Sequence, residues 1–489
     1  MDANKSIRTK GKTILSYYNN MSKPVKASFW FVLCNIMQRG VSLLSTPIFT
    51  RIMTTEQYGL YSVYNSWYSI ILILATLNLS SGVYNNAITH YMDDRDEITS
   101  SFQGLSTTVT LILVAVYLVG MGFWTDILEL QPLLMLIMIV EIIFVPAYLF
   151  WTVGQRYDYE YRKIIPVTTI LAVASPVLGI IAVLSTEYKA EARILTYSLV
   201  QIIIGIVFYV YNLKKGKKFY SRKYWKYALE FNIPLIPHYL SMTVLNQSDR
   251  IMISKMVGNS EAAIYNVAYT VAMLMNIINN AINSSFVPYT YKSLKNKNYD
   301  GLKKNTNLLL AFVGIMCILI MAFGPEVIAL FATEEYYDAI WVIPPVAASV
   351  YFMFLYPLFS NVEFYYGKTK YVMYASCIGA VLNIALNYYF IRIFGYYAAG
   401  YTTLVCYIVF SFAHYILQRW IVKKEKIEAE EIYSTKFILL FSVVVLIAML
   451  GMTVTYQHVI IRYFVIVVIA IGIIWKRNLI IKVVKDMRK

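Results

Sequence analysis

Four charged side chains stand inside long apolar stretches of the sequence, and these are the residues best suited to do chemistry there. They are Arg39, Glu141, Asp249 and Arg250. A guanidinium holds phosphate oxygens in a forked geometry, and a carboxylate binds a proton or a cation. In hydrocarbon each such group is costly unless it meets a partner or a wet cavity. The sequence therefore points to anion binding at the arginines and ion coupling at the carboxylates.

Arg39 lies about twelve residues into an apolar stretch, roughly 18 Å along a helix and near the middle of a bilayer. Asn35, Arg39, Ser42 and Thr46 follow at helical spacing, so one helix face is polar. This pattern favours an anchor for an anionic head group, with Asn35 beside Arg39. The alternative is an arginine satisfied by neighbouring backbone carbonyls.

The two carboxylates are the ion-coupling candidates. Glu141 lies at a depth similar to that of Arg39, so it is either a protonation site or a structural partner of Arg39. Asp249 and Arg250 are adjacent, so on a helix their side chains point about 100° apart and cannot pair well. Each needs another partner. Arg250 also lies near an outer membrane interface, which leaves a functional and a local structural role open.

Amide side chains at helical spacing are candidates for binding sugar hydroxyls. The stretch NIINNAINSS places them on one helix face, where they either line a cavity or join helices. The predicted substrate-binding set is Arg39, Arg51, Arg250, Asn35, Asn246, Asn276, Asn280 and Asn283. We expect no catalytic residue, no metal site and no cofactor; the coupling ion is either H⁺ or Na⁺.

These residues must be held by membrane-spanning helices. The chain has 489 residues, of which 59% are hydrophobic and only 14% charged, which excludes a cytosolic enzyme. Hydropathy predicts an all-α polytopic membrane protein with about fourteen spans, since backbone groups in hydrocarbon must be paired within each segment. The spans are 27–48, 58–82, 103–124, 131–152, 164–184, 193–213, 228–253, 262–288, 306–331, 337–361, 371–391, 397–420, 434–453 and 459–475.

Basic residues fix the orientation of these spans. With the N-terminus inside, 35 of the 43 lysines and arginines fall on the cytoplasmic side. The expected organisation begins with a basic N-terminus (1–26), an N-lobe of six spans (27–213) and a basic linker (214–227). A C-lobe of six spans (228–421), a connector (422–433), two further spans (434–475) and a basic tail (476–489) follow. The basic segments are expected to attract anionic lipids rather than nucleic acid.

A short turn repeats six spans apart. Arg51, Glu56 and Tyr61 follow the first span, and Lys255, Glu261 and Tyr265 follow the seventh with a one-residue slip. Because an even number of spans separates the two turns, the halves enter the membrane from the same side. This predicts parallel repeats related by an axis along the membrane normal.

The sequence resembles the lipid-linked oligosaccharide flippases of the multidrug, oligosaccharidyl-lipid and polysaccharide exporter superfamily. The resemblance covers nearly the whole chain and rests on two stretches: the turn from Arg51 to Tyr61, and the segment from Ile233 to Tyr269, which contains Pro234 and Pro237. It implies two six-helix lobes around a central cavity, plus two peripheral helices. It also implies cationic cavity residues for a lipid pyrophosphate, which Arg39 matches in kind and location. The two prolines permit the seventh span to bend.

Three functions remain open from the sequence. The first is a flippase that moves a polyprenyl-diphosphate-linked oligosaccharide from the cytoplasmic to the outer leaflet of the cell membrane for surface polysaccharide export. Other polysaccharide-assembly membrane proteins are the expected partners of such a flippase. The second is a cation-coupled multidrug exporter, and the third is a membrane scaffold. A cationic cargo would be repelled by Arg39, and a scaffold would not explain the buried charges, so the pattern favours the flippase.

The topology is directly testable. Reporter fusions after residues 130, 219, 300 and 456 should read outside, inside, inside and outside, because the intervening spans reverse the chain at each crossing. A reading on the outside for residue 219 would overturn the fourteen-span assignment.

Overall fold

The fold is all-helical over residues 21–475, the part of the chain that the computed structural model describes. The described chain forms two compact units. The first consists of residues 21–48 and 72–234, and the second of residues 49–71 and 235–475. Helices α2 (Lys23–Ile52) and α3 (Thr55–Thr76) each begin in one unit and end in the other.

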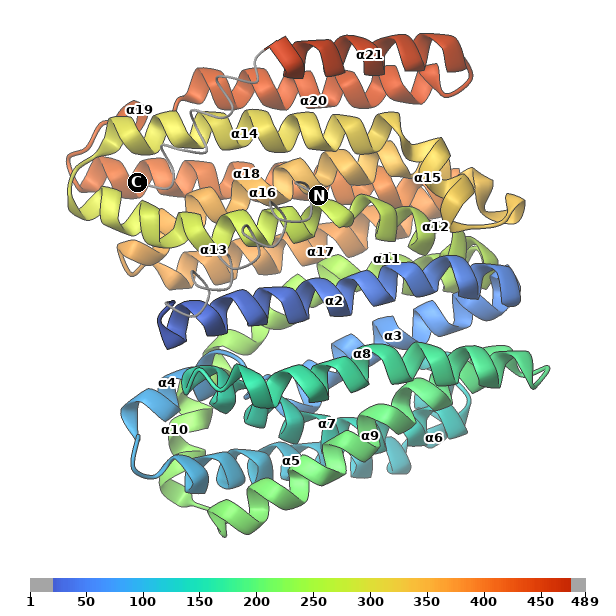
Figure 1. The fold of residues 1–489 in the computed structure, drawn as a ribbon, viewed down its shortest axis with the longest axis vertical. Helices are drawn as coiled ribbons and strands as arrows, with labels where there is room; N and C mark the ends of the chain where they lie inside the picture. Colours follow the sequence, from blue (N-terminus) through green and yellow to red (C-terminus); the bar gives the residue numbers. More distant parts are fainter. Residues whose placement is uncertain (1–20, 476–489) are drawn as a thin grey trace, which may run out of the picture. The chain divides into compact units, whose positions relative to one another are not determined.

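The first unit is built around α9, which packs against three long helices (Figure 1). Its core contains the rings of Tyr84, Phe102 and Phe150, all fully buried. The helices that complete the unit are α4 (Gly82–His90), α5 (Arg95–Val119), α6 (Met121–Leu128), α7 (Pro132–Tyr157), α8 (Tyr161–Leu184), α9 (Lys189–Gly216) and α10 (Arg222–Asn232).

The second unit is built around α16, which packs against α12, α13, α14, α18 and α20 (Figure 1). Most of α16 is buried, as expected of a helix that is apolar on every side. The helices after the first unit are η1 (Ile233–Leu235), α11 (Ile236–Met256), α12 (Asn259–Ala272), α13 (Leu274–Lys295), α14 (Tyr299–Ala322), α15 (Gly324–Phe331), η2 (Glu334–Trp341), α16 (Ile343–Tyr365), α17 (Thr369–Phe394), α18 (Tyr397–Lys424), α19 (Ala429–Ile432), α20 (Thr435–Thr455) and α21 (Val459–Trp475).

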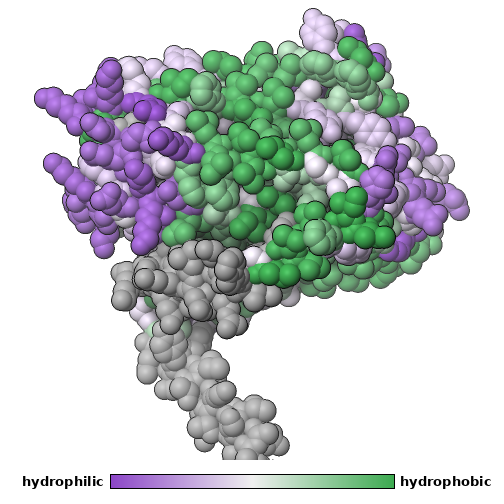
Figure 2. All heavy atoms as spheres, turned by 90° about the horizontal axis from the view of Figure 1, so that it is seen from above, coloured by the Kyte–Doolittle hydropathy of each residue, from purple (hydrophilic) through white to green (hydrophobic). Residues whose placement is uncertain are grey.

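Eleven helical segments within the described residues are long and apolar enough to cross a membrane. The remaining predicted spans correspond to α3, α11 and α21, which are helical but shorter or more polar. Figure 2 shows hydrophobic side chains over the middle of the visible face and hydrophilic side chains at both of its ends. The chain is thus a multi-pass membrane protein; the count of fourteen spans stays a prediction.

The seventh predicted span is interrupted where the sequence has its prolines. A 3₁₀ turn, Ile233–Leu235, separates α10 from α11. Pro234 lacks a backbone N–H and cannot continue the α-helical hydrogen bonding, which explains the break. The amphipathic α10 is therefore a separate helix that ends in the first unit, and α11 carries Asp249 and Arg250 in the second.

The two repeated turns meet inside the second unit. The Thr55 hydroxyl at the start of α3 donates to Ser260 Oγ at 3.1 Å. Gly59 lies against the backbone of Asn259, so closely that a Cβ at residue 59 would stand 1.9 Å from the Asn259 carbonyl oxygen. A side chain at residue 59 would therefore force α3 and α12 apart. This contact explains why residues 49–71 pack with the C-terminal unit rather than with the rest of the predicted N-lobe.

Replacing Gly59 by alanine should destabilise the second unit, because the added methyl group overlaps backbone atoms that cannot move aside locally. We expect a loss of about 1–3 kcal/mol in the free energy of unfolding. Thermal unfolding of the detergent-solubilised protein, followed by tryptophan fluorescence, measures it. Gly451→Ala is the matched control, since nothing lies within 4 Å of its added Cβ. Equal stability of the two variants would contradict the close approach.

Candidate functional site

Arg39 presents a guanidinium that no protein group holds. Its side chain is exposed, as is that of Asn35 one turn earlier on α2. Within residues 21–475, no hydrogen bond or ion pair involves Arg39. Further along the predicted polar face, Thr46 is buried and donates to the Ser42 carbonyl at 3.2 Å. The alternative that neighbouring carbonyls satisfy Arg39 therefore has no support in the structure, and its five N–H donors are available to a ligand.

Glu141 is separated from Arg39. Its side chain on α7 is 1% exposed, and its Oε2 accepts a hydrogen bond of 2.6 Å from the Ser198 hydroxyl on α9. No ion pair joins Glu141 to Arg39 among the described residues. The prediction that Glu141 is the structural partner of Arg39 is therefore wrong in this structure. Its role as a protonation site stays a prediction.

Asp249 is the centre of a polar cluster inside the second unit. The side chain is fully buried, and four neutral groups surround its carboxylate. Thr403 donates to Oδ2 at 2.8 Å, Tyr265 also donates to Oδ2, and Asn387 donates to Oδ1 at 2.6 Å. The Asn383 amide lies 3.5 Å from Oδ1.

Helices α11, α12, α17 and α18 each contribute to this cluster. A second layer of hydroxyls is bonded to the amides: Ser248 donates to Asn383 Oδ1 at 2.7 Å, and Thr402 donates to Asn387 Oδ1. The cluster is therefore rich in oxygen atoms, and no ion pair neutralises Asp249 within the described chain. Carboxylate, amide and hydroxyl oxygens are the ligands that hard cations prefer. The assignment of amide oxygen and nitrogen is reversible by rotation, so both asparagines can turn an oxygen inward.

Arg250 points away from Asp249, as their adjacency predicts, and is held by the protein. It is 5% exposed; Nε donates to Asn266 Oδ1 at 2.8 Å and Nη1 donates to the Asn246 carbonyl at 2.5 Å. Its guanidinium also lies 4.0 Å from the ring centroid of Tyr269. The local structural role therefore fits Arg250 better than the predicted substrate-binding role.

The other predicted binding residues are dispersed. Arg51 is exposed and donates to the Leu330 carbonyl at 3.1 Å. The Asn246 side-chain oxygen accepts from the hydroxyls of Tyr269 at 2.9 Å and Tyr407 at 3.2 Å, which makes it part of the packing around Arg250. Neither residue is shown to share a site with Arg39.

The asparagine stripe of α13 divides between two faces. Asn280 is exposed, and Asn276 and Asn283 are partly exposed. Asn279 is instead 6% exposed, and neither of its amide atoms has a hydrogen-bond partner within residues 21–475. The three more accessible amides remain candidates for sugar binding, whereas Asn279 faces the protein interior.

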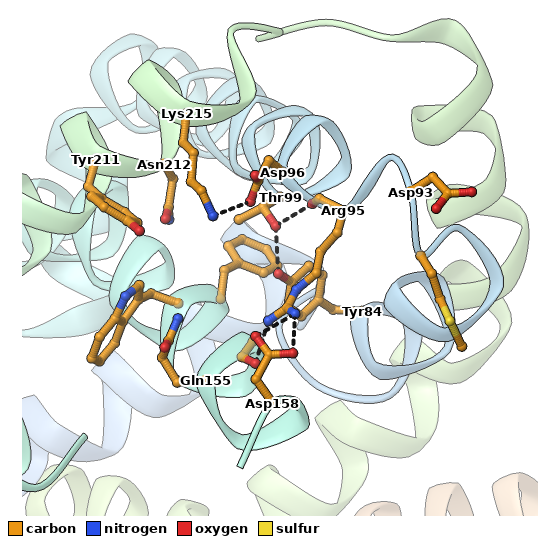
Figure 3. A pocket seen from close by; sticks show the side chains of 14 residues that line it. Tyr84, Asp93, Arg95, Asp96, Thr99, Gln155, Asp158, Tyr211, Asn212 and Lys215 are labelled. Atoms are coloured by element: carbon orange, nitrogen blue, oxygen red, sulfur yellow. Dashed lines mark hydrogen bonds and ion pairs between the residues drawn. The ribbon is translucent and has the colours of Figure 1, made fainter. Parts of the chain in front are cut away.

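A polar pocket of about 250 Å³ lies at one end of the first unit, between the start of α5 and the ends of α7 and α9 (Figure 3). Arg95 Nη1 contacts both carboxylate oxygens of Asp158 at 2.6 and 2.7 Å, and its other terminal nitrogen donates to the Gly154 carbonyl. Lys215 lies 2.9 Å from Asp96 Oδ1. The charges that line the pocket are thus mainly paired with one another, which ties the ends of three helices together.

The sequence gives no sign of this pocket, because the charges that line it come from the ends of different spans. Charges there are typical of topology signals, and nothing in their spacing shows that they converge. Next to the pocket, the Tyr224 hydroxyl donates to Asp94 at 2.7 Å. This hydrogen bond, together with the nearby Lys223 ammonium, lowers the pKa of Asp94 and fastens α10 to the first unit.

Among the described residues, no group of three His, Cys, Asp or Glu side chains has the arrangement of a metal site.

Arg250→Ala should destabilise the protein, because it removes two charge-assisted hydrogen bonds and a cation–π contact. We expect a loss of about 2–4 kcal/mol in the free energy of unfolding. Thermal unfolding measures this loss, with Arg51→Ala as the exposed control. Normal stability of Arg250→Ala combined with lost transport would instead restore a direct role for Arg250 in substrate binding.

The chain is similar in sequence to known protein families. A sequence model of a family described as "Polysaccharide biosynthesis protein" matches residues 25–294, and one described as "MatE" matches residues 234–389. The chain is 23% identical over 379 residues to "Lsg locus putative protein 1" of Haemophilus influenzae, covering 74% of this chain and 90% of that protein.

Two solved structures share the fold. One is described as lipid II flippase MurJ in an inward closed conformation, with a TM-score of 0.67, 16% identity, and coverage of 92% of this chain and 99% of that one. The other is an inward-facing multidrug resistance transporter of the MATE family, with a TM-score of 0.61, 15% identity, and coverage of 79% and 95%. At these identities the likeness concerns the fold alone.

Proposed function

We propose that this chain, which belongs to the polysaccharide biosynthesis protein family, is a flippase for a polyprenyl-diphosphate-linked oligosaccharide. It moves the lipid from the cytoplasmic to the outer leaflet by alternating access, in the service of a surface polysaccharide. The observation that carries the proposal is the unpaired, exposed guanidinium of Arg39 in the first span. A diphosphate supplies the charge and the oxygen geometry that such a group binds. Anionic lipids at the cytoplasmic face and other polysaccharide-assembly proteins are the further partners that we propose.

A multidrug exporter is the second candidate, since the MATE family shares the fold and its sequence model matches the middle of the chain. An organic cation would need an accessible carboxylate. Glu141 and Asp249 are 1% and 0% exposed, and both accept hydrogen bonds from protein groups. The accessible charge that the first span offers has the opposite sign, so this candidate is the weaker one.

Removal of the gene distinguishes the two candidates. A flippase deletion should leave lipid-linked repeat units on the cytoplasmic leaflet and strip the surface polymer, which labelled extracts and surface staining would show. Normal polymer together with new sensitivity to cationic dyes would support the exporter instead.

Arg39→Ala should abolish polymer export at normal membrane abundance, because the lost guanidinium serves the ligand rather than the fold. Arg39→Lys should retain a few per cent, since an ammonium keeps the charge but not the forked donors. Polymer yield and immunoblotting of membranes measure both effects, with Gln38→Ala as the neighbouring control. Loss of the folded protein in both Arg39 variants would refute the head-group role.

Asp249 is the coupling site in this proposal. Asp249→Asn keeps the side chain's shape but removes its charge, so the variant should no longer bind Na⁺ or H⁺. Its transport rate should therefore fall at least tenfold. Binding of ²²Na⁺ to purified protein across pH distinguishes the two ions. Glu141→Gln is the parallel variant; transport at the normal rate over all pH values and sodium concentrations would remove Glu141 from consideration.

A further inference from the structure

A second buried carboxylate in the C-terminal unit has a different environment from that of Asp249. Glu363 on α16 and His414 on α18 are both 0% exposed. Nδ1 of His414 lies 2.9 Å from Oε1 and 2.8 Å from Oε2 of Glu363. Both helices end on the cytoplasmic side in the predicted topology, and Glu363 lies two residues before the end of α16 at Tyr365. The pair therefore occupies the cytoplasmic half of the unit.

The pair sits among aromatic rings. The imidazole of His414 packs against Tyr356, with ring centroids 4.8 Å apart, and against Phe410, with centroids 4.7 Å apart. Its second nitrogen, Nε2, is buried and has no hydrogen-bond partner among the described residues. Within the described chain, no further hydrogen bond reaches the carboxylate of Glu363. The two side chains thus satisfy only each other.

Other titratable groups around the pair are neutral or engaged elsewhere. On α11, His238 is the electrostatic neighbour of His414 and is bonded to the Ser376 hydroxyl of α17 at 2.8 Å. After α19, the Tyr433 hydroxyl donates to the Leu358 carbonyl of α16. Further along α18, Arg419 bonds to Tyr415, to Thr435 of α20 and to Glu430 of α19. The amide nitrogen of Gln418 is buried and unpaired.

The geometry fixes the protonation pattern of the ring. Two acceptors cannot approach to 2.8 Å without a proton between them, so an ionised Glu363 requires the proton on Nδ1 of His414. The neutral imidazole then presents a lone pair at Nε2. In that state the pair carries one negative charge in apolar surroundings. One further proton at Nε2 makes the imidazolium and brings the net charge to zero.

This contrasts with Asp249, whose carboxylate accepts hydrogen bonds from three neutral donors, Tyr265, Asn387 and Thr403. The charge of Glu363 is balanced by one ring alone, so its stability depends on whether His414 holds a second proton. Hydration of the site would change that balance, because water stabilises the charged form and a dry interior does not. A movement that wets the cytoplasmic ends of α16 and α18 would therefore change the proton affinity.

We propose that Nε2 of His414, backed by the carboxylate of Glu363, is a proton-binding site that takes up one proton from the cytoplasm in one state of the transport cycle and releases it to the cytoplasm in another. Uptake forms the Nε2–H bond and breaks one O–H bond of hydronium, which leaves a water molecule, and release reverses both changes. The coupling part of this inference rests on the proposed transport function, whereas the proton site itself does not. Sodium or proton binding at Asp249 is a separate event in a different cluster.

Proton binding is measurable on the resting protein by NMR of ring-labelled histidine in nanodiscs. The chain has four histidines, His90, His238, His414 and His458, so the signals are few, and His414→Gln and His238→Gln assign them. We expect the ring signals of His414 to report proton binding at Nε2 over the pH range in which the protein stays folded. Glu363→Gln should lower its proton affinity about tenfold or more, because the anionic partner is lost. A His414 signal that does not change over this range, or that is indifferent to Glu363→Gln, would overturn the proton site.

Coupling is tested by complementation of the gene deletion. His414→Gln and Glu363→Gln, both at normal membrane abundance, should fail to restore the surface polymer, whereas His238→Gln should restore it. Restoration by His414→Gln would overturn the coupling. If the deletion itself leaves the polymer intact, the proposed flippase function fails, and the NMR titration still decides the proton site. Glu363→Gln is expected to fold normally, because the glutamine amide oxygen can accept the hydrogen bond from Nδ1 of His414 in place of the carboxylate. Failure of this variant to support export is therefore not explained by misfolding.

Discussion

The cost of burying charge in an apolar helix bundle governs this structure. A carboxylate within a membrane protein needs hydrogen-bond donors, because no water or lipid headgroup reaches it. Asp249 obtains them from three other helices, and in doing so it holds α11 against α17 and α18. The hydrophobic effect provides no attraction between helices in lipid, so such polar contacts and close packing must supply the specificity.

Close backbone packing provides the other part of that specificity. Gly59 lets α3 approach the start of α12 to within contact of the Asn259 backbone, and Thr55 and Ser260 bond across the same junction. The two repeated turns therefore contact each other directly and form an interface within the second unit. Small residues that permit such approaches are typical of helix contacts in membranes.

The charged groups inside the predicted spans fall into two classes, those with hydrogen-bond partners in the protein and those without. Arg250 and Asp249 are buried and hydrogen-bonded to neighbouring protein groups. Arg39 has the same intrinsic cost but receives no protein partner in the described chain. A charged group without a protein partner must be satisfied by water or by another molecule, whereas Arg250 is satisfied by the protein itself. Glu363 and His414 are intermediate between these cases. They are hydrogen-bonded to each other through Nδ1 of His414, but Nε2 of the same ring has no partner among the described residues.

The sequence by itself determined the helical class, the membrane location and the approximate positions of the helices, because each of these depends on local composition and helical periodicity. It also indicated the break near Pro234 and the divergence of Asp249 from Arg250, since backbone geometry fixes both. Only the tertiary structure decided which groups meet. The hydrogen bond from Asn387 to Asp249 joins residues 138 positions apart, and the bond between Glu363 and His414 joins residues 51 positions apart. Such pairings depend on how separate helices rotate and pack, which periodicity along one helix cannot specify.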